Sequence, residues 1–376
     1  MQRADVVVVG GGPAGASCAA RLVDAGLQVV VVDRARFPRD KPCAGWITPE
    51  AVEAVGLVPD EYGRGRTLQP VRRFRVGWIG GEAREVSYDR PVSYGILRRE
   101  LDAWLLERSR ARVRLGEGVT SLRRARGGWV VNESLTAPLL VGAGGHFCPV
   151  ARMLKGPGRS RGVVVAQEME VHLSPGQAAL CRVAADRPEL DFTSDFSGYG
   201  WCFRKGEYLN VGLGRRDPRS LAAEVRTYVA WLEHEGRIPA GLPAPLRGHA
   251  YRLREGRPPR VSDEGVLLVG DAAGLAHAAS GEGILPAILS GEVASEVLLE
   301  AMNGGGAEAF ESYPQRLAAR IGPRSEWTVP GPLRALAGRA LLGSTWLTRH
   351  VVLDRFFLHR RPDAALPAHV PEPATR

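Results

Sequence analysis

The chain has 376 residues, which predicts two or three domains. Its 50 basic residues outnumber its 41 acidic residues and give a net charge of +9, and all but three of the basic residues are arginines. No basic run alternates with aromatic residues, the five cysteines lack C-x-x-C spacing, and no apolar run reaches the roughly 18 residues of a transmembrane helix. We therefore expect a reduced, cytoplasmic protein without a signal peptide, a metal site or a nucleic-acid partner, whose basic charge would suit an anionic lipid or an acidic substrate.

A strand, a glycine turn, a helix and a second strand open the chain. The four valines from Val6 to Val9 predict a strand buried on both faces, and a second such strand is expected over 29–32, directly before Asp33. Between them, a G-x-G-x-x-G turn leads into a helix expected over 14–25, with Gly26 as its stop. The glycines of the turn are Gly10, Gly12 and Gly15.

This arrangement is typical of dinucleotide binding. The glycines allow a tight turn, a close approach of the backbone to a pyrophosphate and close packing of the helix on the sheet. The helix N-terminus, with Pro13 in its first turn, offers N–H groups to the phosphates, and Asp33 can accept hydrogen bonds from ribose hydroxyls. The motif alone does not separate FAD from NAD.

Shorter elements follow up to residue 141. Thr48 is expected to cap a short helix with Pro49 at its first position. A hairpin is expected over 72–88, a helix over 97–110 with an apolar face, and several short strands over 111–141.

The next part of the chain is rich in predicted strands. We expect a strand over 163–173, a strand pair over 200–204 and 208–213, and a return strand over 246–254. One helix, over 217–235 with Asp217 as its cap, interrupts them.

A second glycine-rich segment follows a buried strand expected over 266–269. It reads Gly270-Asp271-Ala272-Ala273-Gly274, and a carboxylate at this end of a strand lies where open α/β sheets bind ligands. At this point the chain resembles the FAD-dependent two-domain flavoproteins, in which the equivalent Asp binds the ribityl chain of FAD. The resemblance therefore implies FAD rather than NAD.

The segment Ser280-Gly281-Glu282-Gly283-Ile284 opens the last long helix, with Pro286 in its first turn. Free amides there would face an anion. In the flavoproteins that the chain resembles, this helix start points at the pyrimidine edge of the flavin, and its dipole would stabilise the negative charge of reduced flavin.

Three further stretches resemble the geranylgeranyl reductase-like flavoproteins, which reduce isolated C=C bonds in polyprenyl lipids. The loop FPRDKPCAG over 37–45 is similar to the family's F-P-R-x-K-x-C-G-G loop beside the isoalloxazine. YGWCFRKG over 199–206 and NVGLG over 210–214 look like the Y-x-W-x-F-P-x-G and N-V-G-x-G strand pair that lines the substrate cavity. LRRELD over 97–102 is similar to the helix whose arginine reaches the FAD pyrophosphate, and Arg98 is the better match.

The chain departs from these patterns at several positions. Arg204 stands in place of the family's proline, and the bulky Trp46 directly follows the loop over 37–45. In the G-A-D-G-x-x-S segment, Gly144 replaces the Asp and Cys148 the Ser. In flavin hydroxylases that Asp-Gly element helps to hold FAD and touches NAD(P)H. Because its Asp is replaced here, two electron donors stay open, NAD(P)H and a ferredoxin-type protein.

The resemblance implies an FAD-dependent oxidoreductase that reduces C=C bonds of an isoprenoid or other apolar substrate by hydride transfer from reduced flavin. A flavin-dependent monooxygenase is an alternative, although the hydroxylases' G-Q-G-x-N lacks its Asn at 281–285. A flavin halogenase is a second alternative, although its W-x-W-x-I-P is only partly matched at 201–203. A non-catalytic FAD-binding protein is the third.

The expected site residues follow from the motifs and the resemblance. Cys43 is a candidate proton donor or a polar group shaping the pocket, with a small buried side chain as the plain alternative, and His277 is a second catalytic candidate; His146 is expected to be structural. Tyr199, Trp201 and Phe203 alternate on a strand and form either a wall of an apolar substrate cavity or plain core. The cofactor-binding residues are expected to be Gly10, Gly12, Pro13, Ala14, Gly15, Asp33, Arg34, Cys43, Ala44, Arg98, Val119, Gly270, Asp271, Gly281, Gly283 and Ile284.

The expected fold is α/β, α+β overall. A Rossmann-like FAD-binding domain would be built from the separated segments 1–71, 93–160 and 258–325, and a mainly antiparallel substrate sheet from 72–92 and 161–257. The C-terminal segment 326–376 is expected to be helical to about Arg360 and frayed beyond. Its mixture of apolar and arginine residues over 333–357 predicts either a packing layer on the substrate domain or a peripheral contact with anionic lipid.

Overall fold

The computed structural model describes residues 1–376 except 156–162, 217–219, 244, 257, 325–330 and 360–376. The chain divides into two compact units, each assembled from separated segments. The first unit consists of Met1–Cys43, Arg98–Val165 and Gly248–Thr328, and the second of Ala44–Leu97, Ala166–Arg247 and Val329–Arg376. This division groups residues 44–71 and the C-terminal segment, which the sequence placed elsewhere, with the strand-rich unit.

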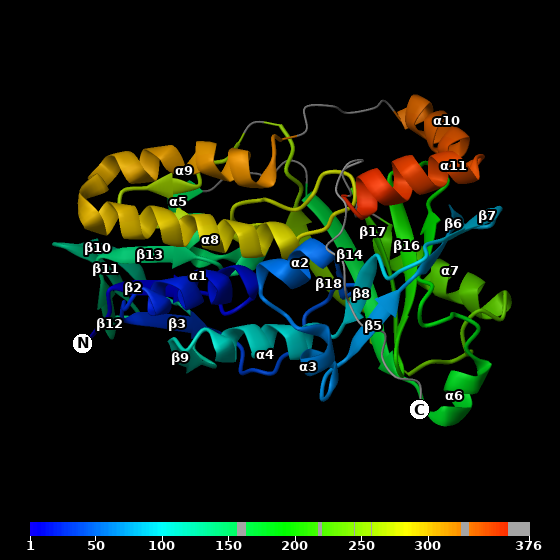
Figure 1. Ribbon diagram of the computed structural model, residues 1–376, viewed down its shortest axis with the longest axis horizontal. Coiled ribbons are helices and arrows are strands. Elements are labelled where there is room, and N and C mark those ends of the chain that lie inside the picture. The colour runs from blue at the N-terminus through cyan, green and yellow to red at the C-terminus, as the bar shows by residue number, and fades with distance from the viewer. Residues whose placement is uncertain (156–162, 217–219, 244, 257, 325–330, 360–376) are drawn as a thin grey trace. The chain divides into compact units, whose positions relative to one another are not determined.

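A mostly parallel sheet forms the centre of the first unit (Figure 1). Its strands lie in the order β19, β20, β13, β2, β3 and β9, and only β19 is antiparallel to its neighbour. The valines of the expected N-terminal strand are at most 4% exposed, because helices cover both faces of such a sheet. The strand bounds are β2 Val6–Val9, β3 Val29–Asp33, β9 Arg112–Leu115, β13 Leu139–Gly142, β19 Ser262–Asp263 and β20 Val266–Leu268.

The helices of the first unit lie close to this sheet and to one another. A Cβ on Gly291 would lie 2.3 Å from the carbonyl oxygen of Ala14, so the glycine allows two helices, α1 and α8, to touch. Figure 1 shows α9 running alongside α8. The helix bounds are α1 Pro13–Asp24, α4 Arg98–Arg108, α5 Pro149–Lys155, α8 Ile284–Glu300 and α9 Gly306–Ile321. A small sheet contains β1 Gln2–Arg3, β12 Leu135–Ala137, β11 Gly128–Val131 and β10 Leu122–Ala125.

The second unit contains a mainly antiparallel sheet, as expected. Strands β14, β17, β16, β15, β6 and β7 are neighbours in that order; from β17 to β7 the described pairs are antiparallel except that of β15 with β6, which is parallel. Their bounds are β14 Val163–His172, β17 Tyr208–Arg215, β16 Gly198–Lys205, β15 Glu189–Phe192, β6 Arg73–Trp78 and β7 Ala83–Ser87. A small sheet adds β4 Trp46–Ile47, β8 Ser93–Ile96 and β5 Leu68–Val71. The helices are α2 Pro49–Ala54, α3 Pro59–Gly63, α6 Pro175–Leu180 and α7 Leu221–His234. The return strand, β18 Arg247–Arg252, begins at the boundary of the units.

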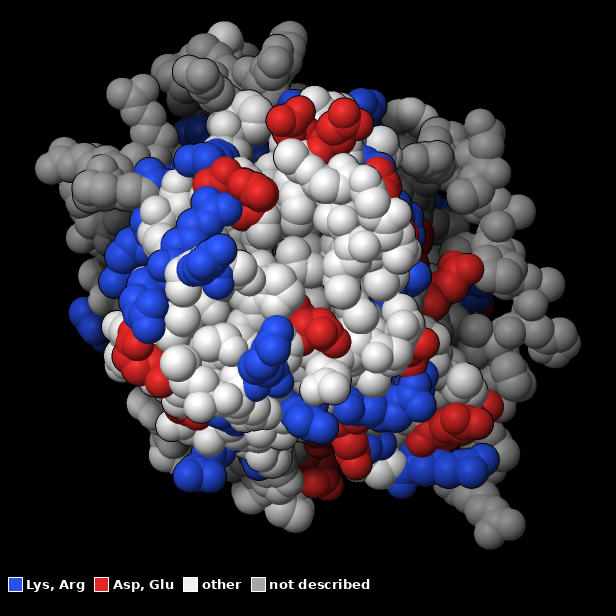
Figure 2. Space-filling model, turned by 90° about the vertical axis from the view of Figure 1, so that its left-hand side faces the viewer, with Lys and Arg blue, Asp and Glu red and all other residues white. Residues whose placement is uncertain are grey.

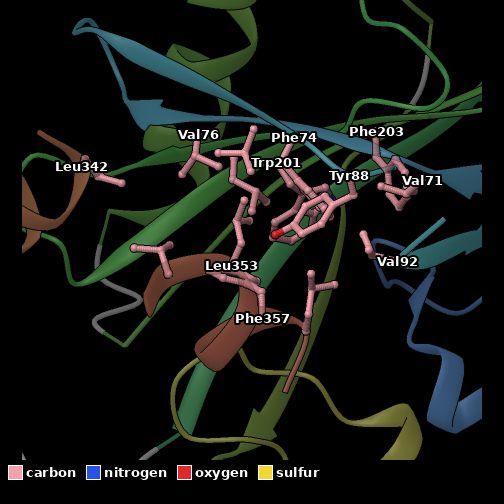
Figure 3. Close-up of a cluster of buried hydrophobic side chains, with 14 residues drawn as sticks. Val71, Phe74, Val76, Tyr88, Val92, Trp201, Phe203, Leu342, Leu353 and Phe357 are labelled. Carbon is pink, nitrogen blue, oxygen red and sulfur yellow. The ribbon is translucent and has the colours of Figure 1, made fainter. Parts of the chain in front are cut away.

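The C-terminal helices pack into the core of the second unit (Figure 3). They are α10 Gly331–Leu342, α11 Thr345–Leu347 and a π-helix over Thr348–Phe357. The ring of Phe357 lies nearly parallel to Trp46, with centroids 5.6 Å apart, and 5.3 Å from the ring of Tyr199. Leu342, Val352 and Leu353 join the same buried cluster as the strand residues Phe74 and Trp201. The described part of the C-terminal segment therefore forms a packing layer on the second unit, which is one of the two roles expected from the sequence.

Two helix starts differ from expectation. Thr48 is the N-cap of α2, but its hydroxyl makes no cap hydrogen bond and is a buried oxygen without a partner among the described residues. Helix α7 begins at Leu221 with Ser220 as its N-cap, and the expected cap Asp217 lies outside the described residues. Propensity rules gave both helices here, but at α2 they did not give a side-chain hydrogen bond at the N-cap.

The positive charge is dispersed where it can be seen. On the face that Figure 2 shows, Lys or Arg and Asp or Glu side chains lie side by side around a broad uncharged area. The net charge of +9 therefore does not gather into one continuous basic patch on this face.

Candidate functional site

The glycine turn after β2 has the tight geometry that its sequence predicts. Gly10 has a φ of +113°, and a Cβ there would lie 2.4 Å from the carbonyl oxygen of Ala143. A Cβ on Gly15 would lie 1.9 Å from the carbonyl oxygen of Gly10, so only glycine lets the helix pass this close to the turn. At Gly12, in contrast, the nearest atom is the Nη2 of Arg39 at 3.6 Å. The backbone is therefore open at the one glycine that is expected to face a pyrophosphate.

The N-terminus of α1 has no capping side chain. Gly12 is the N-cap, with an extended backbone, and Pro13 is the first helical residue. Amide groups of this first helical turn are thus available to an anion, and the helix dipole favours one. The neighbouring Arg39 guanidinium adds a positive charge on the same side.

Asp33 lies beside the glycine turn, at the carboxyl end of β3. Its Oδ2 accepts a hydrogen bond from the backbone N–H of Gly11 at 2.8 Å, and its Oδ1 accepts one from Ala35 at the same distance. The loop that carries the half-buried Val119 reaches this place, because the N–H of Glu117 donates to the carbonyl of Asp33. Arg34 is exposed next to that loop, and a Cβ on Gly118 would lie 3.8 Å from its Cβ. These contacts bring Asp33, Arg34 and Val119 together.

Arg98 is buried at the start of α4 and forms a bidentate ion pair with Asp102. Its Nε and Nη2 lie 2.9 Å from the two carboxylate oxygens, and the Nη2 of Arg39 lies 3.0 Å from Asp102 Oδ2. Burial lowers the pKa of Arg98, but the charge of Asp102 and contacts with Cys43 outweigh it and raise the pKa. Arg98 therefore stays charged beside the half-buried thiol of Cys43. Its expected contact with the FAD pyrophosphate stays a prediction.

Asp271 follows β20 and is held by two basic side chains. His249 Nε2 lies 3.3 Å and Lys41 Nζ 3.8 Å from its Oδ2, and these two nitrogens are 3.0 Å apart. Burial raises the pKa of Asp271, but the hydrogen bond with His249 and the charges of Lys41 and Arg98 outweigh burial and lower the pKa to about 2. Burial lowers the pKa of both Lys41 and His249. Asp271 is thus a stable carboxylate at the carboxyl edge of the parallel sheet.

The start of α8 lies next to this carboxylate. A Cβ on Gly283, the N-cap of α8, would lie 3.5 Å from Asp271 Oδ1. The carboxylate of Glu282 accepts a hydrogen bond from the N–H of Leu285, so one of the amides expected to face an anion already has a partner. The half-buried His277 is tied to this loop through its backbone, since its N–H donates to Glu282 and its carbonyl accepts from Gly281. Asp271, Gly281, Gly283, Ile284 and His277 therefore lie close together.

Gly144 stands where the family's Asp-Gly element has its Asp, and it packs against Cys148. A Cβ on this residue would lie 3.2 Å from the Cα and 3.3 Å from the Sγ of Cys148, which is tighter than most real contacts. Burial raises the pKa of the Cys148 thiol. An Asp at 144 would require Cys148 to move, so the two departures from the family pattern are linked.

In the second unit, the three aromatic residues of β16 are neighbours in a packed core. Trp201 and Phe203 are 8% and 2% exposed, and the ring of Tyr199 lies 6.1 Å from that of Trp201. The indole N–H of Trp201 donates to Asn210 Oδ1 at 2.6 Å. Their packing role is therefore clear, and a role in binding an apolar substrate stays a prediction.

Sequence reasoning missed Arg39, which lies near Gly12, and Lys41 and His249, which lie near Asp271. The first two stand in the FPRDKPCAG loop, where their positions relative to Cys43 were a usable signal. His249 stands in β18, and nothing in its local pattern connects it with Asp271. Among the residues that the structure describes, no three His, Cys, Asp or Glu side chains gather in a way that could hold a metal ion.

Comparisons with known proteins agree with this geometry. A family profile described as an FAD binding domain matches residues 3–58. The chain is 31% identical over 350 residues to a menaquinone reductase of Mycobacterium tuberculosis (strain CDC 1551 / Oshkosh), covering 85% of this chain and 81% of that one. It is 30% identical over 319 residues to digeranylgeranylglycerophospholipid reductase 1 of Methanopyrus kandleri, covering 79% and 81%. A geranylgeranyl bacteriochlorophyll reductase-like protein from Thermoplasma acidophilum has the same fold, with a TM-score of 0.71, 19% identity and coverage of 94% and 99%.

Proposed function

Because the chain belongs to the geranylgeranyl reductase-like family of FAD-dependent oxidoreductases, we propose that it uses FAD to reduce C=C bonds of an isoprenoid or other apolar substrate. One observation carries the proposal for this chain. Asp33 ends β3 and Asp271 follows β20, two strands of one mostly parallel sheet, so both carboxylates stand at the carboxyl ends of strands, where open α/β sheets bind ligands.

The residues at this edge fit FAD in charge and in shape. The open backbone at Gly12, the first turn of α1 and the guanidinium of Arg39 suit the pyrophosphate. Asp33 suits the ribose hydroxyls of the adenosine half, and Asp271 the hydroxyls of the ribityl chain. The remaining cofactor contacts are proposed at Ala14, Gly15, Arg34, Cys43, Ala44, Arg98, Val119, Gly270, Gly281, Gly283 and Ile284.

The chemistry that bound, reduced FAD supplies is hydride transfer to one carbon of the double bond. The other carbon then needs a proton, and we assign the Cys43 thiol as its donor, with His277 as the second candidate. Lys41 and His249 keep Asp271 ionised and oriented. Tyr199, Trp201 and Phe203 are assigned to the apolar substrate wall.

Two further parts of the proposal concern partners. The absence of the Asp-Gly element at Gly144 favours a ferredoxin-type protein over direct use of NAD(P)H.

No helix among the described residues is long and apolar enough to cross a membrane. Three apolar side chains of the C-terminal segment, Leu333, Leu336 and Trp346, are 59 to 69% exposed and support a peripheral contact with lipid. Equal co-sedimentation of the full chain and a 1–330 truncation with anionic liposomes would contradict the proposed lipid contact.

The experiment that tests the reductase proposal uses the purified protein reconstituted with FAD. The flavin is reduced anaerobically, and a geranylgeranyl lipid and a menaquinone are offered separately, with products identified by mass spectrometry. Saturated product without oxygen supports the proposal. A product that forms only with oxygen and carries an added oxygen atom supports a monooxygenase, and a halide-dependent product supports a halogenase. Absence of bound flavin after reconstitution defeats all three.

A further inference from the structure

Lys205, at the end of β16, is a completely buried lysine. Its exposed fraction is 0%, and it is one of only three lysines in the chain. A buried ammonium group is unfavourable unless each of its three N–H donors finds an acceptor. All contacts described below lie within the second unit.

The three donors of Lys205 match three acceptors. Its Nζ lies 3.0 Å from the carbonyl oxygen of Ala44 and 3.1 Å from that of Ile96, and it forms an ion pair with the carboxylate of Glu170. Two of the three acceptors are therefore main-chain carbonyls on separate segments. Such a group fixes backbone position rather than merely balancing a charge.

Two glycines make room for this side chain. A Cβ on Gly45 would lie 2.1 Å from the carbonyl oxygen of Ile96 and 2.6 Å from Lys205 Nζ, and Gly45 has a φ of +69°. A Cβ on Gly95 would lie 2.8 Å from Lys205 Cγ. The N–H of Ile96 also donates to the carbonyl of Gly45 at 2.7 Å. The turn at 44–45 is thus held from two sides, by β8 and by the lysine.

The same polar network reaches further side chains of β16 and β17, the strand pair that is expected to line the substrate cavity. Asn210 is 0% exposed; its Nδ2 donates to Glu170 Oε1 at 3.3 Å and to Glu168 Oε2 at 3.1 Å, and its Oδ1 accepts from Trp201. Trp201, Asn210, Glu170 and Lys205 therefore form one hydrogen-bonded chain that ends at Ala44. A network of this kind specifies one arrangement when every member has a partner.

We propose that Lys205 is a positioning residue for the expected cofactor loop over 37–45: its ammonium sets the backbone of Ala44 and Gly45, the two residues that follow Cys43 in the chain. This inference rests on the proposed function, in which Cys43 and Ala44 contact FAD. Lys205 acts through the backbone and touches neither the cofactor nor the substrate.

The test compares four variants of the FAD-reconstituted full chain. Lys205→Met removes the ammonium, and Lys205→Met/Glu170→Gln also removes the carboxylate that would otherwise lose its partner. Gly45→Ala disturbs the same turn from the other side. Arg237→Met/Glu189→Gln is the matched control, since Arg237 is a buried cation of the same unit whose hydrogen bonds go to Glu189 and Asp191 instead of the loop.

The readouts are the FAD dissociation constant, the visible circular dichroism of bound FAD, and hydrogen exchange of residues 44–47 and 93–96 in the apoprotein. We expect the double variant to recover most of the melting temperature lost by Lys205→Met, yet to bind FAD at least tenfold more weakly, with an altered spectrum and faster exchange in both segments. Gly45→Ala should share the spectral change, and the Arg237 control should lower the melting temperature without it.

Wild-type affinity, spectrum and exchange in the double variant would overturn the proposal, even if Lys205→Met alone does not fold. Failure of the proposed function gives a different pattern. Wild-type protein that binds FAD but reduces no alkene contradicts the reductase activity, whereas the affinity and exchange changes in the Lys205 variants still decide the positioning role.

Discussion

The carboxylate of Asp33 accepts a hydrogen bond from the backbone amide of Gly11, with 2.8 Å between Gly11 N and Asp33 Oδ2. This contact joins the end of β3 to the glycine turn after β2. It holds an acidic side chain next to the N-terminus of α1, which is where the ribose and phosphates of a dinucleotide need complementary groups.

Asp33→Ala should therefore weaken FAD binding roughly 10- to 100-fold, since hydrogen bonds to charged groups contribute about 1.5–3 kcal/mol. Asp5→Ala is the matched control, because Asp5 also accepts a backbone hydrogen bond, from Gln28 at 2.7 Å, but precedes β2. Fluorescence titration of the apoproteins with FAD measures both. Equal affinities for the two variants would contradict the assignment of Asp33.

Gly12→Ala and Gly15→Ala should separate cofactor binding from folding. No atom lies nearer than 3.6 Å to a Cβ on Gly12, so the Gly12→Ala apoprotein should keep its melting temperature and lose at least tenfold in FAD affinity. A Cβ on Gly15 would lie 1.9 Å from the carbonyl of Gly10, so Gly15→Ala should lower both. Calorimetry of each apoprotein and titration with FAD check this. Tight FAD binding by Gly12→Ala would show that the phosphates do not approach this glycine.

The spacing of the glycines encodes backbone geometry directly, which is why the turn, α1 and β3 were predictable from sequence. The two parallel strands β13 and β20 that complete the edge were predictable as buried runs, because both of their faces are covered. The carboxylates Asp33 and Asp271 followed from their places after such strands.

Side-chain partners across the fold were not predictable. Lys205 stands beside Gly206 at a turn, a context typical of exposed lysines, and its burial depends on Gly45 and Gly95 in distant segments. His249 meets Asp271 only because β18 and the loop after β20 approach each other in the fold. Local sequence patterns carry no information about such pairings.

Phe357→Ala should destabilise the protein by about 3–5 kcal/mol, because its buried ring packs against Trp46 and Tyr199 and its loss leaves a cavity. Trp346→Ala, at a residue 64% exposed in the same C-terminal segment, is the control and should change the free energy of unfolding by well under 1 kcal/mol. Denaturant titration measures both. A small effect of Phe357→Ala would mean that the C-terminal segment is not part of the core.

Lys155 should give the chain a pH-dependent stability term above neutral pH. Burial, then Arg252, lower its pKa from 10.5 to about 8, while its ammonium donates to the carbonyl of Ala272. Between about pH 8 and 10.5 the unfolded chain holds this proton and the folded chain does not, so the folded state gains relative stability as pH rises.

The free energy of unfolding of wild type minus that of Lys155→Met should accordingly become more positive from pH 7.5 to 10. The matched control is Arg226→Met, at an exposed arginine, whose difference from wild type should stay constant because arginine remains charged throughout this range. Denaturant titrations at several pH values give these differences. A flat difference for Lys155→Met would contradict the lowered pKa.

The most direct test of the central claim is an anaerobic single turnover that counts electrons. Wild-type protein with stoichiometric FAD is reduced, mixed with excess geranylgeranyl lipid, and followed by flavin absorbance and by mass spectrometry of the lipid. The reductase account predicts that each flavin reoxidised yields one saturated double bond, with two hydrogens gained, and that Cys43→Ser slows this step. Flavin that stays reduced until oxygen is admitted, with no gain of hydrogen in any alkene offered, would contradict it.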